Sequence, residues 1–291
     1  MKISVSSYSF NQYLKDGRMK QLDTVRKAAE MGFEGIEFTD LVPFESPTKY
    51  DKMKYASQIR EEADRCGIKI VAYCIGASLY CENAEENERA VASACDSVDI
   101  AAELGAPVMR HDVTGKTKFG DRTVSFDKQL PTIAENARRI TEYALSKGIK
   151  TCTENHGFVA QDSDRVERLY NAVGHDNYGL LVDIGNFACA DEDSVKAVSR
   201  VAPYAVHVHV KDFYINRFGE EACFKGGFLS RGCNTLLGSV IGEGDIPTAQ
   251  CIAILKKAGY NGFVSIEYEG AEDCMKGLCR GIINLRRYIG E

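Results

Sequence analysis

The sequence lacks tryptophan, has only 6 prolines and 5 histidines in 291 residues, and contains no apolar run near the roughly 18 residues of a membrane span. Lys and Arg number 36 against 42 Asp and Glu, so the net charge is 36 − 42 = −6. Binding a phosphate backbone needs a basic surface. We therefore expect neither a nucleic-acid nor a membrane partner, and the 44% hydrophobic content is typical of a globular chain.

Disulfide chemistry is also poorly supported, although the chain has 11 cysteines. Their number is odd and they form no Cys-x-x-Cys pair, which favours a reducing compartment. The first residues run directly into a strand-like segment, without the basic start, apolar stretch and cleavage site of a signal peptide. These features predict a cytoplasmic protein.

Short β-branched runs alternate along the chain with longer stretches of helical periodicity. The eight expected strands are 3–8, 35–38, 68–74, 107–111, 149–154, 178–183, 205–210 and 262–268. The expected helices include 21–31, 52–66, 85–104, 127–147, 164–173 and 248–258. Several helices end before a glycine, as expected for a left-handed cap, namely at Gly32, Gly67, Gly148 and Gly259.

Eight βα units predict one (β/α)8 TIM barrel spanning residues 1–291, with no linker that would divide it. An open doubly wound sheet is the competing arrangement, but the turn 8–15 lacks Gly-x-Gly-x-x-Gly. The longest irregular segment, 211–247, leaves a strand at its carboxyl end, so we expect it over the barrel mouth. Its Gly242-Glu243-Gly244 could offer backbone N–H groups to a phosphate, although no Walker pattern is present.

Polar residues stand where the hydrophobic strands end, and in a TIM barrel those ends share one face. Alternation of side chains along each strand allows four consecutive strands to direct carboxylates and imidazoles to one point. A single strand-end acid is more often a surface or capping residue, and a lone His207 would be an interior histidine. Four converging ends indicate one divalent metal ion, Mn²⁺, Mg²⁺ or Co²⁺, with Zn²⁺ also compatible. The predicted ligands are Glu154, Asp183, His209 and Glu267.

At these residues the chain resembles the xylose isomerase-like TIM barrels, the sugar isomerase and epimerase group of the AP endonuclease family 2 superfamily. The resemblance spans essentially the whole chain. Its carriers are the segments 32–37, 154–157, 183–186, 207–212, 242–246, 259–263 and 265–267. It implies that the ligand on the seventh strand is the histidine that begins His-x-Lys-Asp, His209, and that Glu154 and Glu267 are both ligands and the catalytic acid/base pair.

Further polar residues near the strand ends are candidates for substrate binding: Glu37, His111, His156, Asn186, Lys211 and Arg217. Two positions depart from the epimerases of the group. Asn186 stands where they often have histidine, and Ile215 stands where they commonly have arginine, so that Arg217 is the nearest candidate.

The main functional prediction is a metal-dependent sugar isomerase or epimerase that moves a proton beside a carbonyl through an enediolate. The same metal site also suits a dehydratase or lyase of a keto-sugar or keto-inositol, for which His111 or His156 could supply the acid. An endonuclease IV-like phosphodiesterase would need more metal ligands and a basic groove, and a non-catalytic sugar-binding barrel is a further alternative. The expected partner is a small sugar or sugar derivative, and a homo-oligomer is possible.

Overall fold

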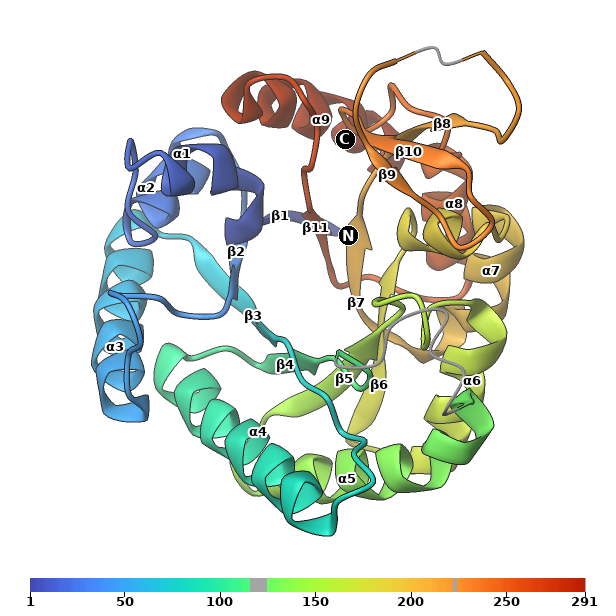
Figure 1. Cartoon of the computed structure of the whole chain (residues 1–291). Coiled ribbons are helices and arrows are strands. Elements are labelled where there is room, and N and C mark those ends of the chain that lie inside the picture. The colour runs from blue at the N-terminus through green and yellow to red at the C-terminus, as the bar shows by residue number, and fades with distance from the viewer. Residues whose placement is uncertain (116–124, 222–223, 291) are drawn as a thin grey trace.

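The computed structural model describes residues 1–115, 125–221 and 224–290. Eight parallel strands close into a barrel in the order β1-β11-β7-β6-β5-β4-β3-β2 (Figure 1). All eight expected strands are present, and the TIM-barrel prediction is confirmed. The barrel strands are β1 (Lys2–Ser6), β2 (Gly35–Thr39), β3 (Lys69–Ile75), β4 (Val108–His111), β5 (Lys150–Glu154), β6 (Tyr178–Asp183), β7 (Ala205–Val210) and β11 (Phe263–Ile266).

Helices surround the barrel on its outside (Figure 1). Each of the six expected helices is present. The described residues also form α1, α7 and α9, which were not among the six named helices. The sequence signal for α9 is weak, because its two interior glycines lower helix propensity. At Gly277 a Cβ atom would lie 2.4 Å from Cζ of Tyr268, so the glycine permits close packing. The helices are α1 (Asn11–Lys15), α2 (Asp23–Glu30), α3 (Lys49–Cys66), α4 (Ala84–Leu104), α5 (Phe126–Ser146), α6 (Ser163–Val173), α7 (Ser194–Val201), α8 (Thr248–Lys257) and α9 (Cys274–Ile289).

The glycines predicted to end helices adopt the left-handed conformation that this role requires. Their φ angles are 84° at Gly32, 67° at Gly67, 72° at Gly148 and 90° at Gly259. Each stop lies shortly before a barrel strand, and it sets the point at which the chain turns back toward the sheet. The glycine that follows each of these helices therefore helps to space the strands around the barrel.

The large hydrophobic core lies between the strands and the helices, while a small apolar cluster fills part of the barrel interior: Ala72, Cys74, Cys152 and Leu181. The ten cysteines of the described residues are all free thiols. No helix in residues 1–115, 125–221 and 224–290 is long and apolar enough to cross a bilayer.

The segment after β7 differs from the expectation of an irregular loop. It forms a three-stranded antiparallel sheet of β8 (Phe213–Asn216), β10 (Thr235–Gly238) and β9 (Phe228–Leu229). Burial of Phe213 and Leu236 gives this sheet an apolar face of its own. A bridge from Gly238 to Gly270 ties it to the segment that follows β11. We call it the rim sheet, because it lies at the rim of the barrel, where it is orange in Figure 1.

Candidate metal centre and active site

The four predicted metal ligands converge at the carboxyl ends of neighbouring strands. Glu154 and Asp183 are the last residues of β5 and β6, His209 lies near the end of β7, and Glu267 directly follows β11. One ligand atom from each lies within 4.8 Å of the others. Three of the side chains are almost fully buried, and that of Glu267 is 12% exposed. We call these four residues the quartet; their binding of a metal ion stays a prediction.

Asp183 carries the clearest sign of a cation site. Its Oδ1 accepts hydrogen bonds from the backbone N–H groups of Gly185, at 2.8 Å, and Asn186, at 2.9 Å. Its Oδ2 is buried without a hydrogen-bond partner among the described residues. Burial raises the pKa of Asp183 to about 7, and the nearby carboxylates of Glu154 and Glu267 add to this while Lys211 opposes it.

Two cations of the chain hold the glutamates of the quartet ionised. Arg110 forms an ion pair with Oε2 of Glu154, and Nζ of Lys211 lies 2.7 Å from Oε2 of Glu267. Burial alone would raise the pKa of both carboxyls. The charges of Arg110 and His209 on Glu154, and of Lys211 and His209 on Glu267, instead hold both pKa values well below the usual range.

The imidazole of His209 presents Nδ1 to all three carboxylates. Nδ1 lies 3.4 Å from Oε1 of Glu154, 3.7 Å from Oε2 of Glu267 and 3.9 Å from Oδ2 of Asp183. It also has no hydrogen-bond partner in the described part of the chain. Buried polar atoms are normally paired. A divalent cation between these oxygens and Nδ1 would satisfy them, so the donor set fits a metal ion that prefers oxygen and imidazole ligands.

Three of the predicted substrate-binding residues line a pocket of about 480 Å³ beside the quartet: His156, Asn186 and Lys211. Nδ2 of Asn186 donates to Oε1 of Glu154 at 3.0 Å, and its Oδ1 accepts from Nζ of Lys211 at 3.3 Å. Phe228, Leu237 and Gly238 of the rim sheet also line the pocket. The expectation that the segment after β7 lies over the barrel mouth is thereby confirmed.

The three other candidates do not line this pocket, and their contact with a substrate stays a prediction. Glu37 is fully buried inside the barrel, where it contacts His207 and His209. His111 is fully buried, and its ring centroid lies 6.3 Å from that of Tyr178. Since side chains alternate along β4 and Arg110 points inward, His111 faces the helices. Arg217 lies in the exposed turn after β8 and does not line the pocket.

The same alternation reveals two residues that the sequence-based selection passed over. Arg110 and Asp112 share the inner side of β4, and Nη2 of Arg110 lies 3.0 Å from Oδ1 of Asp112. This Oδ1 also lies 3.1 Å from Nδ1 of His156. Alternation of side chains along the strand, applied to residues 110–112, would have selected Arg110 and Asp112 as the inward-facing candidates in place of His111.

The two histidines proposed as acids have opposite electrostatic environments. Burial lowers the pKa of His111 to about 4, so its imidazole is neutral at pH 7. Desolvation also acts to lower the pKa of His156, but the hydrogen bond and the charge of Asp112 outweigh it and raise this pKa above its usual value. The side chain of His156 is 46% exposed. Of these two histidines, only His156 combines a raised pKa with access to the pocket.

The glycine-rich segment does not offer its amides to a phosphate. The backbone N–H groups of Gly242 and Gly244 donate to Oδ2 of Asp212, at 2.7 and 3.2 Å, and that of Ile246 donates to Oδ1 at 3.1 Å. A Cβ atom at Gly244 would lie 2.3 Å from Oδ1 of Asp212. The glycines thus enclose the chain's own carboxylate and fix the segment next to Lys211.

The chain is similar in sequence and in fold to known proteins. The chain is 25% identical to the inosose dehydratase of Clostridium perfringens over 276 residues, which cover 92% of this chain and 88% of that one. A D-psicose 3-epimerase from Clostridium cellulolyticum H10, solved with D-tagatose, superposes with a TM-score of 0.76 at 16% identity and covers all of both chains. The IOLI protein with a bound zinc atom gives a TM-score of 0.74 at 15% identity, covering 100% of this chain and 98% of that one.

The two structural likenesses establish the fold alone, because their sequence identities are low. The family assignment comes from the sequence itself. The family model described as xylose isomerase-like TIM barrel matches residues 25–284, which include every strand from β2 to β11 and all four residues of the quartet. The chain therefore belongs to the xylose isomerase-like TIM barrel family.

Proposed function

We propose that this chain is a divalent-metal-dependent dehydratase that removes water from a keto-inositol or a related keto-sugar. The observation that carries the proposal is that His156, whose pKa is raised, lines the pocket beside the quartet. Elimination beside a ketone needs a base for the carbon acid and an acid for the departing hydroxyl. The similarity to an inosose dehydratase supports the same reaction class.

The quartet is the proposed holder of the cation. When bound there, a divalent ion supplies a Lewis acid that polarises the ketone and so acidifies the neighbouring C–H bond. The zinc atom of the IOLI protein supports a site of this kind in the fold. Three carboxylates and one imidazole suit Mn²⁺, Mg²⁺, Co²⁺ and Zn²⁺, so metal identity is decided by titration of the protein with each ion.

Glu267 is the proposed base. It is ionised and its side chain is 12% exposed, whereas that of Glu154 is 2% exposed and has each oxygen bound, one by Arg110 and the other by Asn186. Lys211, beside Glu267, carries a positive charge that can stabilise the negative oxygen of the deprotonated substrate. Asn186 orients both Glu154 and Lys211.

His156 is the proposed acid. The α C–H bond breaks, its proton passes to Glu267 and its electron pair forms the enolate. The enolate then restores the ketone and forms a carbon–carbon double bond as the β C–O bond breaks. The departing oxygen takes a proton from His156 and leaves as water. Asp112 holds Nδ1 of His156, which leaves its other ring nitrogen for this transfer.

Epimerisation is the second candidate. Glu154 and Glu267 are both ionised and come from β5 and from the end of β11, which are separated in the barrel by β6 and β7. Two carboxylates that reach a substrate from different sides can remove a proton from one face and return one to the other. The likeness to a D-psicose 3-epimerase is consistent with this chemistry but establishes the fold only.

One experiment separates the two. Metal-free protein is loaded separately with Mn²⁺, Co²⁺ or Zn²⁺ and incubated in D₂O with a keto-inositol, a ketohexose and a 3-keto-glycoside, and the products are read by mass and NMR. A product lighter by one water supports the dehydratase. Carbon-bound deuterium without loss of water supports the epimerase or isomerase. Failure of every substrate with every ion contradicts both, and Asp183→Asn, with reduced metal content, is the control.

A further inference from the structure

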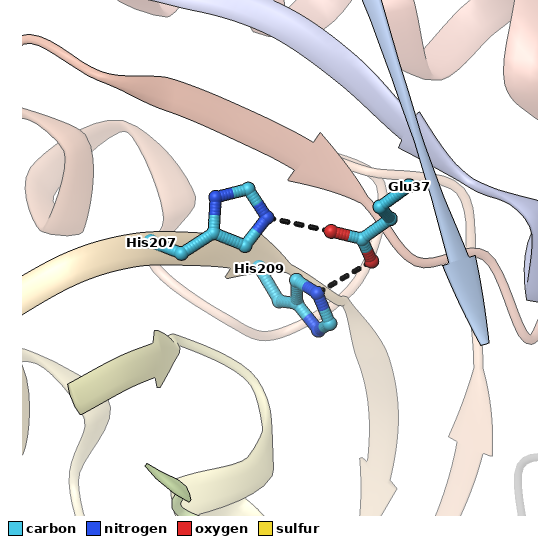
Figure 2. Close-up of side chains that lie close together, drawn as sticks. All are labelled: Glu37, His207 and His209. Atoms are coloured by element: carbon cyan, nitrogen blue, oxygen red, sulfur yellow. Dashed lines mark hydrogen bonds and ion pairs between the residues drawn. The ribbon is translucent and has the colours of Figure 1, made fainter. Parts of the chain in front are cut away.

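A second polar cluster lies inside the barrel, next to the quartet. Glu37 projects inward from β2 between two histidines of β7, His207 and His209 (Figure 2). All three side chains are almost fully buried. Oε2 of Glu37 lies 2.6 Å from Nε2 of His207 and Oε1 lies 2.6 Å from Nε2 of His209. The hydroxyl of Ser265 donates to the same Oε2 at 3.0 Å.

This cluster shares His209 with the quartet, and the two ring nitrogens of His209 face different neighbours. Nε2 points to Glu37 in the barrel interior, and Nδ1 points to the three carboxylates of the quartet. A neutral imidazole carries its proton on one nitrogen and a lone pair on the other. A partner that accepts the proton of Nε2 therefore leaves the lone pair of Nδ1 free to bind a cation.

The spacing of the cluster does not suit a metal ion of its own. Ligands of a tetrahedral zinc ion stand about 2.0–2.2 Å from the metal, which separates a ligand oxygen from a ligand nitrogen by roughly 3.3 Å. Both oxygens of Glu37 instead lie 2.6 Å from their imidazole nitrogens, which is the distance of direct contact. The contact with His207 is a hydrogen bond, and the contact with His209 is a close approach of Oε1 to Nε2 that does not meet hydrogen-bond geometry.

We propose that Glu37 is a positioning residue for the metal centre: its carboxylate holds the Nε2–H of His209, so that Nδ1 is the nitrogen given to a divalent cation in the quartet. His207 and Ser265 fix the carboxylate through Oε2 and leave Oε1 for His209. This inference rests on the proposed function in so far as it requires a cation at the quartet. It assigns a role to a residue that never reaches the substrate pocket.

The test compares Glu37→Gln with Ser265→Ala, which removes a single hydrogen bond to the same carboxylate. Affinity for Zn²⁺ is measured by competition with a chromophoric chelator at fixed pH. Loss of an outer carboxylate from a metal-bound histidine typically weakens metal binding by about 10–100-fold. We expect a loss of this size in Glu37→Gln and a smaller loss in Ser265→Ala, in which His207 still holds the carboxylate. Thermal unfolding in EDTA checks that both variants fold.

A second measurement reports the ring directly and needs no variant. In the Zn²⁺-loaded wild-type protein, ¹⁵N NMR of labelled histidine side chains identifies which nitrogen of His209 carries the proton. A proton on Nε2 and zinc at Nδ1 is the expected result. A proton on Nδ1, or undiminished zinc affinity in Glu37→Gln, overturns the positioning role while the metal centre stands. A wild-type protein that binds no divalent ion overturns the metal centre as well.

Discussion

Lys211 and Glu267 form a buried ion pair between the ends of two adjacent barrel strands, with Nζ of the lysine 2.7 Å from Oε2 of the glutamate. The same ammonium lies 3.8 Å from the unpaired Oδ2 of Asp183 and 3.5 Å from Oε2 of Glu269. Lys211 is therefore, together with Arg110, the chain's own counter-charge for the quartet, and the two neutralise the carboxylates only in part.

Replacing Lys211 by methionine removes that counter-charge. We expect the metal-free variant to lose about 3–5 kcal/mol of stability, because a buried carboxylate is left unpaired. A divalent ion restores part of the lost positive charge, so the rise in Tm on adding Mn²⁺ should be larger in this variant than in the wild type. Thermal melts with EDTA and with Mn²⁺ measure both effects. Lys257→Met, on the exposed side of α8, is the control, and an equal rise in Tm in both variants contradicts the prediction.

Glu267→Gln tests the proposed base against a close neighbour. Glu269, unlike Glu267, lines the pocket, and it too contacts Lys211, but it lies outside the quartet. We expect kcat to fall by at least about 100-fold in Glu267→Gln, the lower end of the range for a general base, and much less in Glu269→Gln. Turnover is measured at equal metal occupancy so that loss of the ion is not counted. Similar losses in the two variants would show that charge at the pocket, and not proton transfer by Glu267, matters.

The pair of His156 and Asp112 predicts an alkaline limit to activity. Desolvation alone would lower the pKa of His156, but Asp112 raises it, so the ring is still protonated at pH 6.5 and loses its proton only as pH rises past this raised pKa. Asp112→Asn removes the stabilising charge, so the alkaline limb of kcat should move to lower pH. Steady-state rates from pH 5 to 9 measure the shift, with Asp176→Asn, far from the pocket, as the control. An unmoved limb assigns the acid to another group.

Metal binding should release protons at neutral pH. Burial raises the pKa of Asp183 to about 7, and the charges of Glu37, Glu267 and Glu154 raise that of His209 against the effect of its burial. Because both folded-state pKa values are raised, their contribution to the stability of the metal-free protein is lost as pH rises through those values. A bound ion needs both groups deprotonated, so its affinity should increase between about pH 6 and pH 8. Calorimetry in two buffers of different ionisation enthalpy counts the protons, and a buffer-independent heat contradicts the prediction.

Asp212 should be a strong determinant of stability. Its carboxylate accepts four backbone N–H groups, and Asp212→Ala would leave these donors buried without an acceptor. An unsatisfied buried group costs about 1–3 kcal/mol, so a total loss of about 3 kcal/mol or more is expected. Urea unfolding measures it, with the exposed Asp176→Ala for comparison. A loss below about 1 kcal/mol would mean that water replaces the carboxylate.

The strands and helices followed closely from the sequence, because β-branched runs, helical periodicity and glycine stops are local signals. The rim sheet was not predicted, because its formation depends on contacts that are not local. The two residues of β9 pair with β10 through contacts that the local pattern of 211–247 does not encode. The sequence could not place all of the substrate-binding candidates, because the direction of His111 depends on strand phase and the exposure of Arg217 depends on its turn.

By itself the sequence determined a βα alternation with acids and imidazoles at the carboxyl ends of its strands, and this was enough to name the quartet. Closure of the barrel decided the rest, because it brings β2 across from β7 and so places Glu37 against His207 and His209. Burial and charge then separated residues of the same type, raising the pKa of His156 at the pocket and lowering that of His111 behind the strand. Protonation and access depend on neighbours distant in the chain, and only the tertiary structure supplies them.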